Sequence, residues 1–554
     1  MCSADSRSAD QKAEFTLTLR QIIFWLVLCV GLLVVTSYLP SAAKPAAPDE
    51  VPIEPLPPDV VIETVVPNAN QLVAMDFTPD GRLLYTERTG NLQVVANGQA
   101  PVTAYTFPVL TEGERGLLGV AVDPNFATNH SVWVYFTKET LYSTDCGGKV
   151  KNRVVRITLN DDNTVTEDPQ TAGCFPVNQP APGYYVTIHN GGNLHFGPDG
   201  KLYIGVGNSN EEINDPIEPA QNLASPLGKL HRYNPTMPLS APADNPFASW
   251  PNTDKSNYAY GLRNPFDFAF DPVSQQLFAT DNGDKCDDEI NLIRPGYNYG
   301  WRIHYPQTPL PCDDDAGPDP RYNTIPPLYH WTPSMAPTGL AFYTGDVIPE
   351  WKNDLFMCAY KNFSTALHHF KLNATRTAIV SHTILSDTIN HQPIQCRTDV
   401  LTGPAGALYY SEGGGYLSGP IQRLTRRSSL ALSSVSTAPA VVRAGEWLTY
   451  TVNVRNVGTQ ANTFALMATL PVEVAIQAVD SGLTFDADHV YWSGVLTSAQ
   501  TLSARFSVQV TSAITIPYLL TTPIEITAPD TQSVNLVSLA MINGRAVFLP
   551  VLRQ

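Results

Sequence analysis

The stretch His189-Asn-Gly-Gly-Asn-Leu-His195-Phe-Gly-Pro-Asp199-Gly-Lys-Leu-Tyr203 decides the fold that we expect of this chain. Its second half predicts a strand, a tight turn and a second strand, because Pro-Asp-Gly supplies turn residues between apolar and aromatic runs. Its first half places an imidazole beside glycines, at which backbone or a flat ligand can approach closely. We therefore predict a repeated β unit with a reactive site near His189.

The same strand-turn-strand unit recurs along the chain. Its copies begin at Met75, Gly119, Leu194, Phe268, Gly339 and Asp399. Six copies predict an all-β, six-bladed β-propeller, an architecture that closes radially and leaves few strand edges open. An ordinary β-sandwich with chance Pro-Asp-Gly turns is the alternative, and six copies disfavour it. Because the spacing between copies is irregular, we expect long loops between blades, and loops commonly carry functional sites.

The sequence changes character at the end of the predicted propeller domain, residues 61–427. Cysteine is absent beyond this point, and apolar and polar residues alternate cleanly in Leu448–Val454 and Leu502–Val510. A period of two marks strands that are half-buried in a sandwich. We therefore predict an immunoglobulin-like β-sandwich at residues 428–540 and a tail at 541–554. The sandwich carries no cluster of candidate catalytic residues, so we interpret it as a spacer or adhesive module.

An uncharged, strongly apolar stretch lies near the N-terminus, between residues 21 and 43. About 20 apolar residues span a bilayer, and basic residues lie mainly before the stretch, which favours a cytoplasmic N-terminus. We expect a cytoplasmic tail at 1–20, a transmembrane anchor or signal segment at 21–38 and a proline-rich linker at 39–60. An uncleaved anchor gives a single-pass protein of the cell membrane whose remaining chain is extracytoplasmic. A cleaved signal peptide is the alternative and gives a secreted protein.

The net charge excludes one class of partner. The chain of 554 residues carries a formal net charge of −17, and without a basic stripe it does not fit nucleic acid.

Six cysteines lie in the predicted exported part, at Cys146, Cys174, Cys286, Cys312, Cys358 and Cys396. An even number in an oxidising compartment favours disulfides, and we expect the pairs 146–174, 286–312 and 358–396. Buried free thiols are the alternative, and no metal-type Cys-x-x-Cys spacing favours zinc.

A run of carboxylates from Asp281 to Glu289, which includes Asp284 and Asp288, is a candidate metal site. Carboxylates this close repel one another unless they are solvated or joined by a cation, and Gly283 exposes carbonyl oxygens in the same turn. Calcium takes mixed carboxylate and carbonyl ligands. A calcium loop and a solvated acidic loop therefore fit the residue types equally well.

Three cationic residues are candidates for binding an anionic or carbonyl group. Arg263 stands ahead of an Asn-Pro pair at a predicted strand entrance, Lys361 follows a strand, and Arg397 precedes the sixth copy. A guanidinium presents a planar charge that is always present. The structural alternatives are that the arginines tie down loops through backbone carbonyls and that the lysine is solvated. His195 lies inside a predicted strand, so we expect it to be packed rather than catalytic.

Several ordered motifs resemble the PQQ-dependent sugar dehydrogenases of the glucose/sorbosone dehydrogenase family, which are six-bladed propellers. The motifs are Leu117–Phe126, His189–Gly200, Tyr260–Pro265, Asp287–Ile293 with Asn298–Trp301, and Ser334–Tyr343. The resemblance covers about residues 65–425. It implies oxidation of the C1 hydroxyl of an aldose or related sugar to a lactone, with PQQ and calcium as cofactors. It also implies a small-molecule sugar substrate and an external electron acceptor.

The resemblance assigns roles to individual residues. It implies that His189 is the general base that takes the hydroxyl proton while hydride passes to the quinone, a task that suits an imidazole. Arg263 matches the arginine beside the reactive quinone carbonyl, and Asn264 and Lys361 match cofactor contacts. The candidate calcium ligands are Gly283 and Asp284 at the cofactor-bound ion, Glu289 and Tyr299 at a structural ion, and Asp288 within the acidic run.

Three positions depart from the family pattern. Ile188 stands where well-studied members carry an aspartate that orients the histidine, and Glu114 stands where they carry a glutamine. Arg397 is a single arginine where two are expected, and it is offset by one position. Glu114 and Arg397 stay candidates for cofactor contacts. Because hedgehog-interacting proteins keep the propeller without catalysis, a non-catalytic extracellular propeller that binds glycans or proteins is the alternative function.

Overall fold

The computed structural model describes residues 51–544 apart from positions 58, 97, 139–145, 147–149, 167–168, 180–184, 210–218, 285–286, 302–323, 362–364, 389, 431, 512 and 530. The predicted cytoplasmic tail and anchor lie outside the described residues, as do most of the linker and residues 545–554 of the C-terminal tail. Within the described part, no helix is long and apolar enough to cross a membrane.

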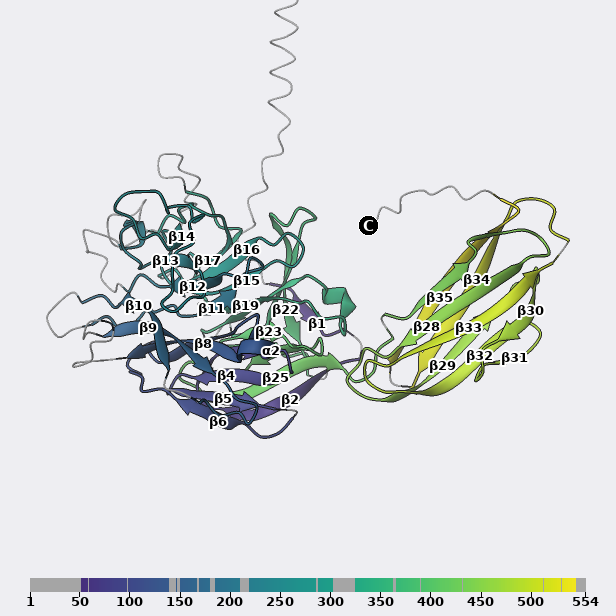
Figure 1. Ribbon diagram of the computed structural model, residues 1–554, viewed down its shortest axis with the longest axis horizontal. Coiled ribbons are helices and arrows are strands. Elements are labelled where there is room, and N and C mark those ends of the chain that lie inside the picture. The colour runs from purple at the N-terminus through teal and green to yellow at the C-terminus, as the bar shows by residue number, and fades with distance from the viewer. Residues whose placement is uncertain are drawn as a thin grey trace, which may run out of the picture. The chain divides into compact units, whose positions relative to one another are not determined.

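Six sheets, five of them four-stranded and one five-stranded, form a β-propeller in the described chain up to residue 426 (Figure 1). Blade 1 contains β3 (Leu72–Phe77), β4 (Leu83–Glu87), β5 (Asn91–Val95) and β6 (Val102–Thr106). Blade 2 contains β7 (Leu117–Val122), β8 (Ser131–Lys138), β9 (Lys151–Thr158) and β10 (Gln170–Pro176). Blade 3 contains β11 (Leu194–Phe196), β12 (Leu202–Val206), β13 (Lys229–Tyr233) and β14 (Asn257–Tyr260).

Blade 4 contains β15 (Pro265–Phe270), β16 (Leu277–Asp281), β17 (Asp288–Ile293) and β18 (Tyr329–Trp331). Blade 5 contains β19 (Pro337–Phe342), β20 (Leu355–Ala359), β21 (His368–Leu372) and β22 (Ile379–Ser386). Blade 6 contains β23 (Val400–Thr402), β24 (Leu408–Ser411) and β25 (Gly419–Arg426). The helical turns of the described chain are α2 (Phe126–Asn129), η2 (Pro219–Gln221) and η3 (Pro349–Trp351). The sequence copies are the first two strands of each blade, so the predicted repeat is confirmed.

The ring closes through a strand that precedes all the repeats. Strand β2 (Val60–Ala69) pairs antiparallel with β25 and supplies the fourth, outermost strand of blade 6. Strand β1 (Ile53–Pro55) pairs parallel with β22 and adds a fifth strand to blade 5. The two ends of the propeller segment are thus held by main-chain hydrogen bonds.

A buried histidine ties β1 to blade 5. His369 Nδ1 lies 3.0 Å from Glu54 Oε2, and its Nε2 lies 2.9 Å from Asp354 Oδ2. Burial alone would lower the pKa of His369, but the two carboxylates outweigh it and the pKa is raised. The hydrogen bond from His369 lowers the pKa of Glu54 to about 2. The imidazolium therefore bridges two carboxylates across the blade edge.

Neighbouring blades are joined by apolar cores and by buried aspartates of the inner strands. Between blades 1 and 2, Leu84 and Val134 are fully buried in one cluster. Three aspartates in or directly before an inner strand accept a main-chain N–H of the next blade: Asp76 from Val122 at 2.7 Å, Asp267 from Leu340 at 2.7 Å and Asp399 from Met75 at 2.5 Å. This repeated bond fixes the offset of one blade against the next.

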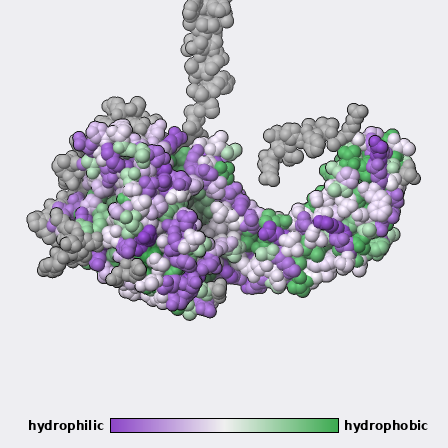
Figure 2. All heavy atoms as spheres, viewed as in Figure 1, coloured by the Kyte–Doolittle hydropathy of each residue, from purple (hydrophilic) through white to green (hydrophobic). Residues whose placement is uncertain are grey.

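The described chain beyond residue 433 forms two further sheets. One contains β26 (Ser434–Ala438), β28 (Trp447–Arg455), β33 (Thr501–Val510) and β30 (Val474–Val479). The other contains β27 (Val441–Val442), β35 (Thr531–Ile542), β34 (Tyr518–Ala528), β29 (Asn462–Thr469), β32 (His489–Leu496) and β31 (Thr484–Phe485). The alternating segments predicted from the sequence are β28 and β33, which pair with Leu448 opposite Val508. Val472 and Ile516 are exposed, and Figure 2 shows several hydrophobic areas on the surface of this sandwich.

Two of the expected disulfides are confirmed. Cys146 is bonded to Cys174 and Cys358 to Cys396. The third expected pair, 286–312, lies outside the described residues. The bond between Cys358 and Cys396 is fully buried, and it links β20 of blade 5 to the segment that enters blade 6.

Candidate active site

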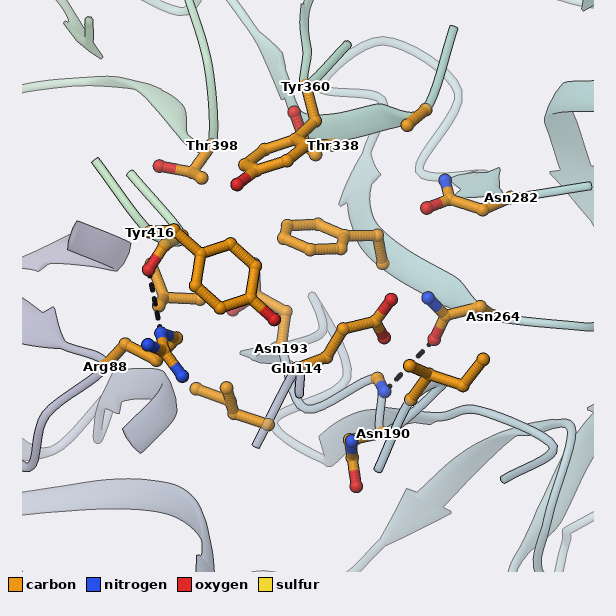
Figure 3. A pocket seen from close by; sticks show the side chains of 17 residues that line it. Arg88, Glu114, Asn190, Asn193, Asn264, Asn282, Thr338, Tyr360, Thr398 and Tyr416 are labelled. Carbon is orange, nitrogen blue, oxygen red and sulfur yellow. Dashed lines mark hydrogen bonds between the residues drawn. The ribbon is translucent and has the colours of Figure 1, made fainter. Parts of the chain in front are cut away.

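A cavity of about 220 Å³ opens among the loops and inner strands of several blades. Figure 3 shows that its polar side chains point inward from different blades. The lining residues are Val73, Arg88, Glu114, Leu118, Ile188, Asn190, Gly191, Asn193, Asn264, Phe266, Asn282, Ala336, Thr338, Tyr360, Thr398, Gly415 and Tyr416. Glu114 and Asn264 are therefore the predicted site residues that line it directly.

His189 lies on the loop that leads into β11, between two residues that line the cavity. Its φ is +54°, a left-handed conformation that non-glycine residues adopt uncommonly. A Cβ on Gly192 would lie 2.8 Å from the Leu118 Cβ and the Tyr135 ring. A Cβ on Gly191 would lie 2.6 Å from the carbonyl oxygen of Gly205. These glycines thus let the loop pack closely against inner strands, with backbone next to Gly191 and side chains next to Gly192.

Two polar side chains hold His189 in place. Its main-chain N–H donates to Glu114 Oε2 at 2.7 Å, and its ring Nδ1 lies 2.9 Å from Asn208 Oδ1. Both His189 and Asn208 are buried, at 4 % and 1 % exposure. Because an amide oxygen only accepts hydrogen bonds, Nδ1 is the donor in this contact, and in the neutral imidazole the lone pair then lies on Nε2. This is the tautomer in which Nε2 can accept a proton.

Arg263 and Asn264 are positioned by Asp281 at the end of β16. Asp281 accepts the main-chain N–H groups of Arg263 and Asn264 at 2.9 and 2.7 Å. Burial raises the pKa of Asp281 to about 7. The Arg263 guanidinium donates to the Asn282 carbonyl at 2.9 Å and lies 5.3 Å from the centre of the Trp301 ring. Burial lowers the pKa of this guanidinium, although Asp284 and Glu114 oppose the shift.

Main-chain bonds connect the histidine loop to these residues. The N–H of Asn208 donates to the Arg263 carbonyl at 2.7 Å. The N–H of Gly191 donates to Asn264 Oδ1 at 3.2 Å, a bond that Figure 3 draws. The predicted base and the predicted arginine therefore belong to one rigid network.

The acidic turn after β16 is held by Asp288. Asp288 Oδ1 accepts the N–H of Gly283 at 2.8 Å, and Oδ2 accepts the N–H groups of Met335 and Ala336, the latter at 2.6 Å. Burial raises the pKa of Asp288, although these bonds oppose the shift. Asp288 thus ties the turn to the entrance of blade 5 through both of its carboxylate oxygens.

Lys361 reaches the same turn through Ser334. Its Nζ donates to the Ser334 carbonyl at 2.9 Å and to the Ser334 hydroxyl, which in turn donates to the Asp284 carbonyl at 3.2 Å. Asp284 Oδ1 lies 4.0 Å from Arg263 Nη2. The lysine of blade 5 is therefore connected to the arginine that precedes blade 4.

Arg397 contacts Tyr360, which lines the cavity and directly precedes Lys361 in sequence. Its Nη1 donates to the Tyr360 carbonyl at 2.9 Å, and its guanidinium carbon lies 5.5 Å from the centre of the Tyr360 ring. Thr398, the next residue, lines the cavity itself. Arg397 thus braces the wall of the cavity.

Glu289 and Tyr299 lie deeper in blade 4 and use their polar atoms within the protein. Glu289 stands opposite Asp281 across β16 and β17, and Asn291 donates to it at 2.8 Å. Burial first, and then the charge of Asp281, raise the pKa of Glu289 well above its ordinary value. The Tyr299 hydroxyl donates to the Leu292 carbonyl at 2.9 Å and accepts the Arg294 N–H at 2.7 Å. The hydrogen bonds described here join Glu289 to Asn291 and Tyr299 to the main chain of Leu292 and Arg294, so a calcium shared by Glu289 and Tyr299 stays a prediction.

Sequence reasoning missed three residues of this site. Asn208 stands in a segment without a motif, and its distance from His189 in sequence gives no signal of the bond between them. Arg88 and Tyr416 line the cavity, and the Arg88 guanidinium carbon lies 4.4 Å from the centre of the Tyr416 ring. The glycines at 413–415 are the sequence signal that could have drawn attention to Tyr416. His195, expected to be packed, lies in β11 with Nε2 2.8 Å from Asp267 Oδ1.

Comparison with known proteins identifies the family. The sequence model of glucose/sorbosone dehydrogenases matches residues 69–417. The chain belongs to the glucose/sorbosone dehydrogenase family. It is therefore an oxidoreductase of the quinoprotein glucose or aldose sugar dehydrogenase type.

Relatives of this family resemble the propeller segment. Aldose sugar dehydrogenase YliI of Escherichia coli is 31 % identical over 362 residues, which are 64 % of this chain and 90 % of the relative. Quinoprotein glucose dehydrogenase B of Acinetobacter calcoaceticus is 30 % identical over 259 residues, 43 % of this chain and 52 % of that protein. The crystal structure of the soluble aldose sugar dehydrogenase of E. coli in its apo form is 28 % identical with a TM-score of 0.52. It covers 66 % of this chain and 100 % of that one.

Proposed function

We propose that this protein oxidises the C1 hydroxyl of an aldose or related sugar to the lactone, with PQQ as hydride acceptor and calcium beside it. The observation that carries the proposal is the 2.9 Å contact between His189 Nδ1 and Asn208 Oδ1. It leaves the lone pair on Nε2 of a histidine that belongs to the same network as Arg263. A proton acceptor and a fixed cation beside one cavity are what removal of a hydroxyl proton and a hydride requires.

The side chains around the cavity fit a flat tricarboxylate such as PQQ, the cofactor that this family binds. Arg88 lines the cavity, while Arg263, Lys361 and Arg397 are each adjacent in sequence to a residue that lines it. These four cationic side chains would attract the carboxylates of the cofactor. Glu114 adds one negative charge within the cavity, and its bond to the His189 N–H assigns it to the histidine loop.

Calcium fits the carbonyl oxygens of Gly283 and Asp284. A carbonyl oxygen has two lone pairs, so Asp284 can accept the Ser334 hydroxyl and still bind an ion. Asp288 holds this turn through main-chain N–H groups. We therefore propose that Asp288 shapes the ion site and that Gly283 and Asp284 supply its ligands.

The chain's own residues handle the proton and the charge. PQQ, when bound, supplies the electrophilic carbonyl that accepts hydride from the sugar C1. His189 Nε2 accepts the hydroxyl proton, while Asn208 keeps Nδ1 protonated and the ring oriented. Arg263, held by Asn282 and Trp301, presents a positive charge that needs no rearrangement when negative charge develops. Asn208 thereby orients the His189 ring, which Ile188 cannot do because its side chain forms no hydrogen bonds.

We also propose that the propeller works outside the cytoplasm at the cell membrane, or as a secreted protein if the N-terminal segment is cleaved. The two disulfides support export, because such bonds persist in oxidising compartments. After cell fractionation, the propeller should be found in the cell-envelope fraction or in the medium. Recovery from the cytosol alone would contradict this proposal.

The function is tested by loading the purified protein with PQQ and calcium and following reduction of an artificial electron acceptor with several aldoses. We expect His189→Ala to lower turnover by about 10²- to 10⁴-fold, the contribution of a general base, while PQQ stays bound. His391→Ala is a matched control, because His391 has the same φ of +54° and is exposed. A wild-type protein that binds PQQ or sugars without turnover would support the non-catalytic alternative instead.

A further inference from the structure

We propose that the disulfide between Cys358 and Cys396 positions one wall of the cavity and thereby sets the affinity of the cavity for PQQ. This inference rests on the proposed function and adds a pair of positioning residues to it. The wall contains Tyr360 and Thr398, and each of them follows one of the two cysteines by two residues. Both cysteines are fully buried and do not line the cavity. The bond therefore acts on a ligand only through the residues that it holds.

The disulfide joins the two segments that carry cationic residues beside the cavity. Lys361 lies just beyond β20, and Arg397 lies on the segment that enters blade 6. The main-chain N–H of Ala359 donates to the Cys396 carbonyl at 3.2 Å. Arg397 Nη1 donates to the Tyr360 carbonyl at 2.9 Å. The disulfide is thus the covalent member of a short series of cross-links between the two segments.

Further hydrogen bonds connect these segments to the rest of the cavity. The N–H of Tyr360 donates to the carbonyl of Ala336 at 2.8 Å. The carbonyl of Arg397 accepts the hydroxyl of Thr338 at 2.8 Å. Ala336 and Thr338 both line the cavity. A shift of either cross-linked segment would therefore change the shape of the site and not only the local packing.

The position of the two segments decides whether their cationic side chains are ordered before a ligand arrives. Lys361 Nζ is held by the carbonyl and the hydroxyl of Ser334, and the Arg397 guanidinium is held by Tyr360. These contacts depend on the spacing between the segments, which the geometry of a disulfide restricts. Immobilising a long side chain on binding costs free energy. Without the disulfide, the binding of a tricarboxylate would also have to order this wall, so its affinity falls.

Titration of the full-length protein with PQQ in the presence of calcium tests this inference. We expect the double substitution Cys358→Ala and Cys396→Ala to raise the Kd for PQQ by about 5- to 100-fold, because ordering each of the two cationic side chains accounts for a factor of about 2 to 12. The matched control is Cys146→Ala with Cys174→Ala, which removes the other disulfide of the described chain from a place that does not line the cavity. Its Kd for PQQ should match that of wild type.

A second control separates positioning from a general loss of stability. Ile157 is buried on β9 of blade 2 and does not line the cavity. Ile157→Ala should destabilise the propeller to an extent similar to loss of the disulfide, yet its Kd for PQQ should match that of wild type at a temperature at which all the proteins are folded. If the alanine pair does not fold, the pair Cys358→Val and Cys396→Ala restores buried volume and takes its place.

Hydrogen exchange of the cofactor-free protein gives a readout that needs neither PQQ nor turnover. The N–H groups of Ala359 and Arg397 donate to the carbonyls of Cys396 and Ser411. Both should exchange faster without the disulfide than in wild type or in Ile157→Ala, because the opening is local. An unchanged Kd for PQQ, an equal loss of affinity in Ile157→Ala, or unchanged exchange at these two amides would overturn the role of the disulfide. A wild-type protein that binds no PQQ would instead refute the proposed function.

Discussion

Replacing Asn208 by alanine should slow turnover while leaving the propeller and its cofactor intact. The substitution removes the acceptor that lies 2.9 Å from His189 Nδ1. Both partners are buried, so the Nδ1–H would lose its bond at a cost of about 1–3 kcal/mol. If the ring turns or changes tautomer to recover that cost, kcat falls by about 5- to 150-fold. The main-chain bond from Asn208 to the Arg263 carbonyl survives, because it uses no side-chain atom.

The assay compares kcat, PQQ titration and the pH–rate profile of wild type, Asn208→Ala and Asn208→Asp. In Asn208→Asp the carboxylate keeps the bond and favours the protonated imidazole, so the acid limb should move to higher pH. PQQ affinity should be the same in all three proteins. Full activity in Asn208→Ala, while His189→Ala stays inactive, would refute the idea that Asn208 sets the tautomer.

Three further predictions concern stability. Because the pKa of His369 is raised and that of Glu54 is lowered to about 2, their link stabilises the fold fully between about pH 4.5 and 6.5. The melting-temperature difference between wild type and His369→Gln should peak there, and it should shrink as His369 deprotonates above and Glu54 is protonated below. Removing the disulfide by the double substitution Cys358→Ala and Cys396→Ala should cost about 4 kcal/mol in denaturant unfolding, since it closes a loop of 38 residues. Gly192→Ala should destabilise by about 2–4 kcal/mol, because its Cβ would meet Leu118 at 2.8 Å.

Two of these three stability predictions have a matched control variant. Gly200→Ala also places alanine at a positive φ, but nothing lies within 4 Å of its Cβ, so it should cost clearly less than Gly192→Ala. His330 is exposed, and His330→Gln should give a flat difference in melting temperature across the same pH range. An equal effect in either pair would contradict the contacts described for Gly192 or His369. Unchanged denaturant stability in the double cysteine variant would contradict the role of the buried bond.

The repeat was predictable because each blade carries its own turn. The Pro-Asp-Gly signals mark the inner hairpins, where both strands are buried and the turn must be tight. The outer strands carry weaker patterns; β6, for example, has no buried residue in its five positions. The sequence placed residues 61–427 in one domain but did not predict that β2 pairs with β25. A contact between residues 60 and 426 leaves no local pattern in the sequence.

The site was predictable where a motif marks it and not where folding brings distant residues together. His189, Arg263 and Lys361 stand in recognisable motifs, and the structure connects them through Asn208, Asp284 and Ser334. Asp284 and Ser334 also stand in segments that the sequence analysis singled out, whereas Asn208 has an ordinary polar side chain whose importance depends on its contact with His189. Ile188 alone therefore suggested that the His189 ring lacks an orienting partner, whereas Asn208 supplies one from another segment.

The strand that completes blade 6 has a consequence for biosynthesis. Val60–Ala69 leaves the ribosome first, yet its partner Gly419–Arg426 is made roughly 350 residues later. During synthesis this early segment stays an unpaired strand edge, so the ring of blades cannot close until nearly the whole propeller has been made. A chain that ends before residue 419 would keep that edge exposed. We expect quality-control proteases to degrade such incomplete chains.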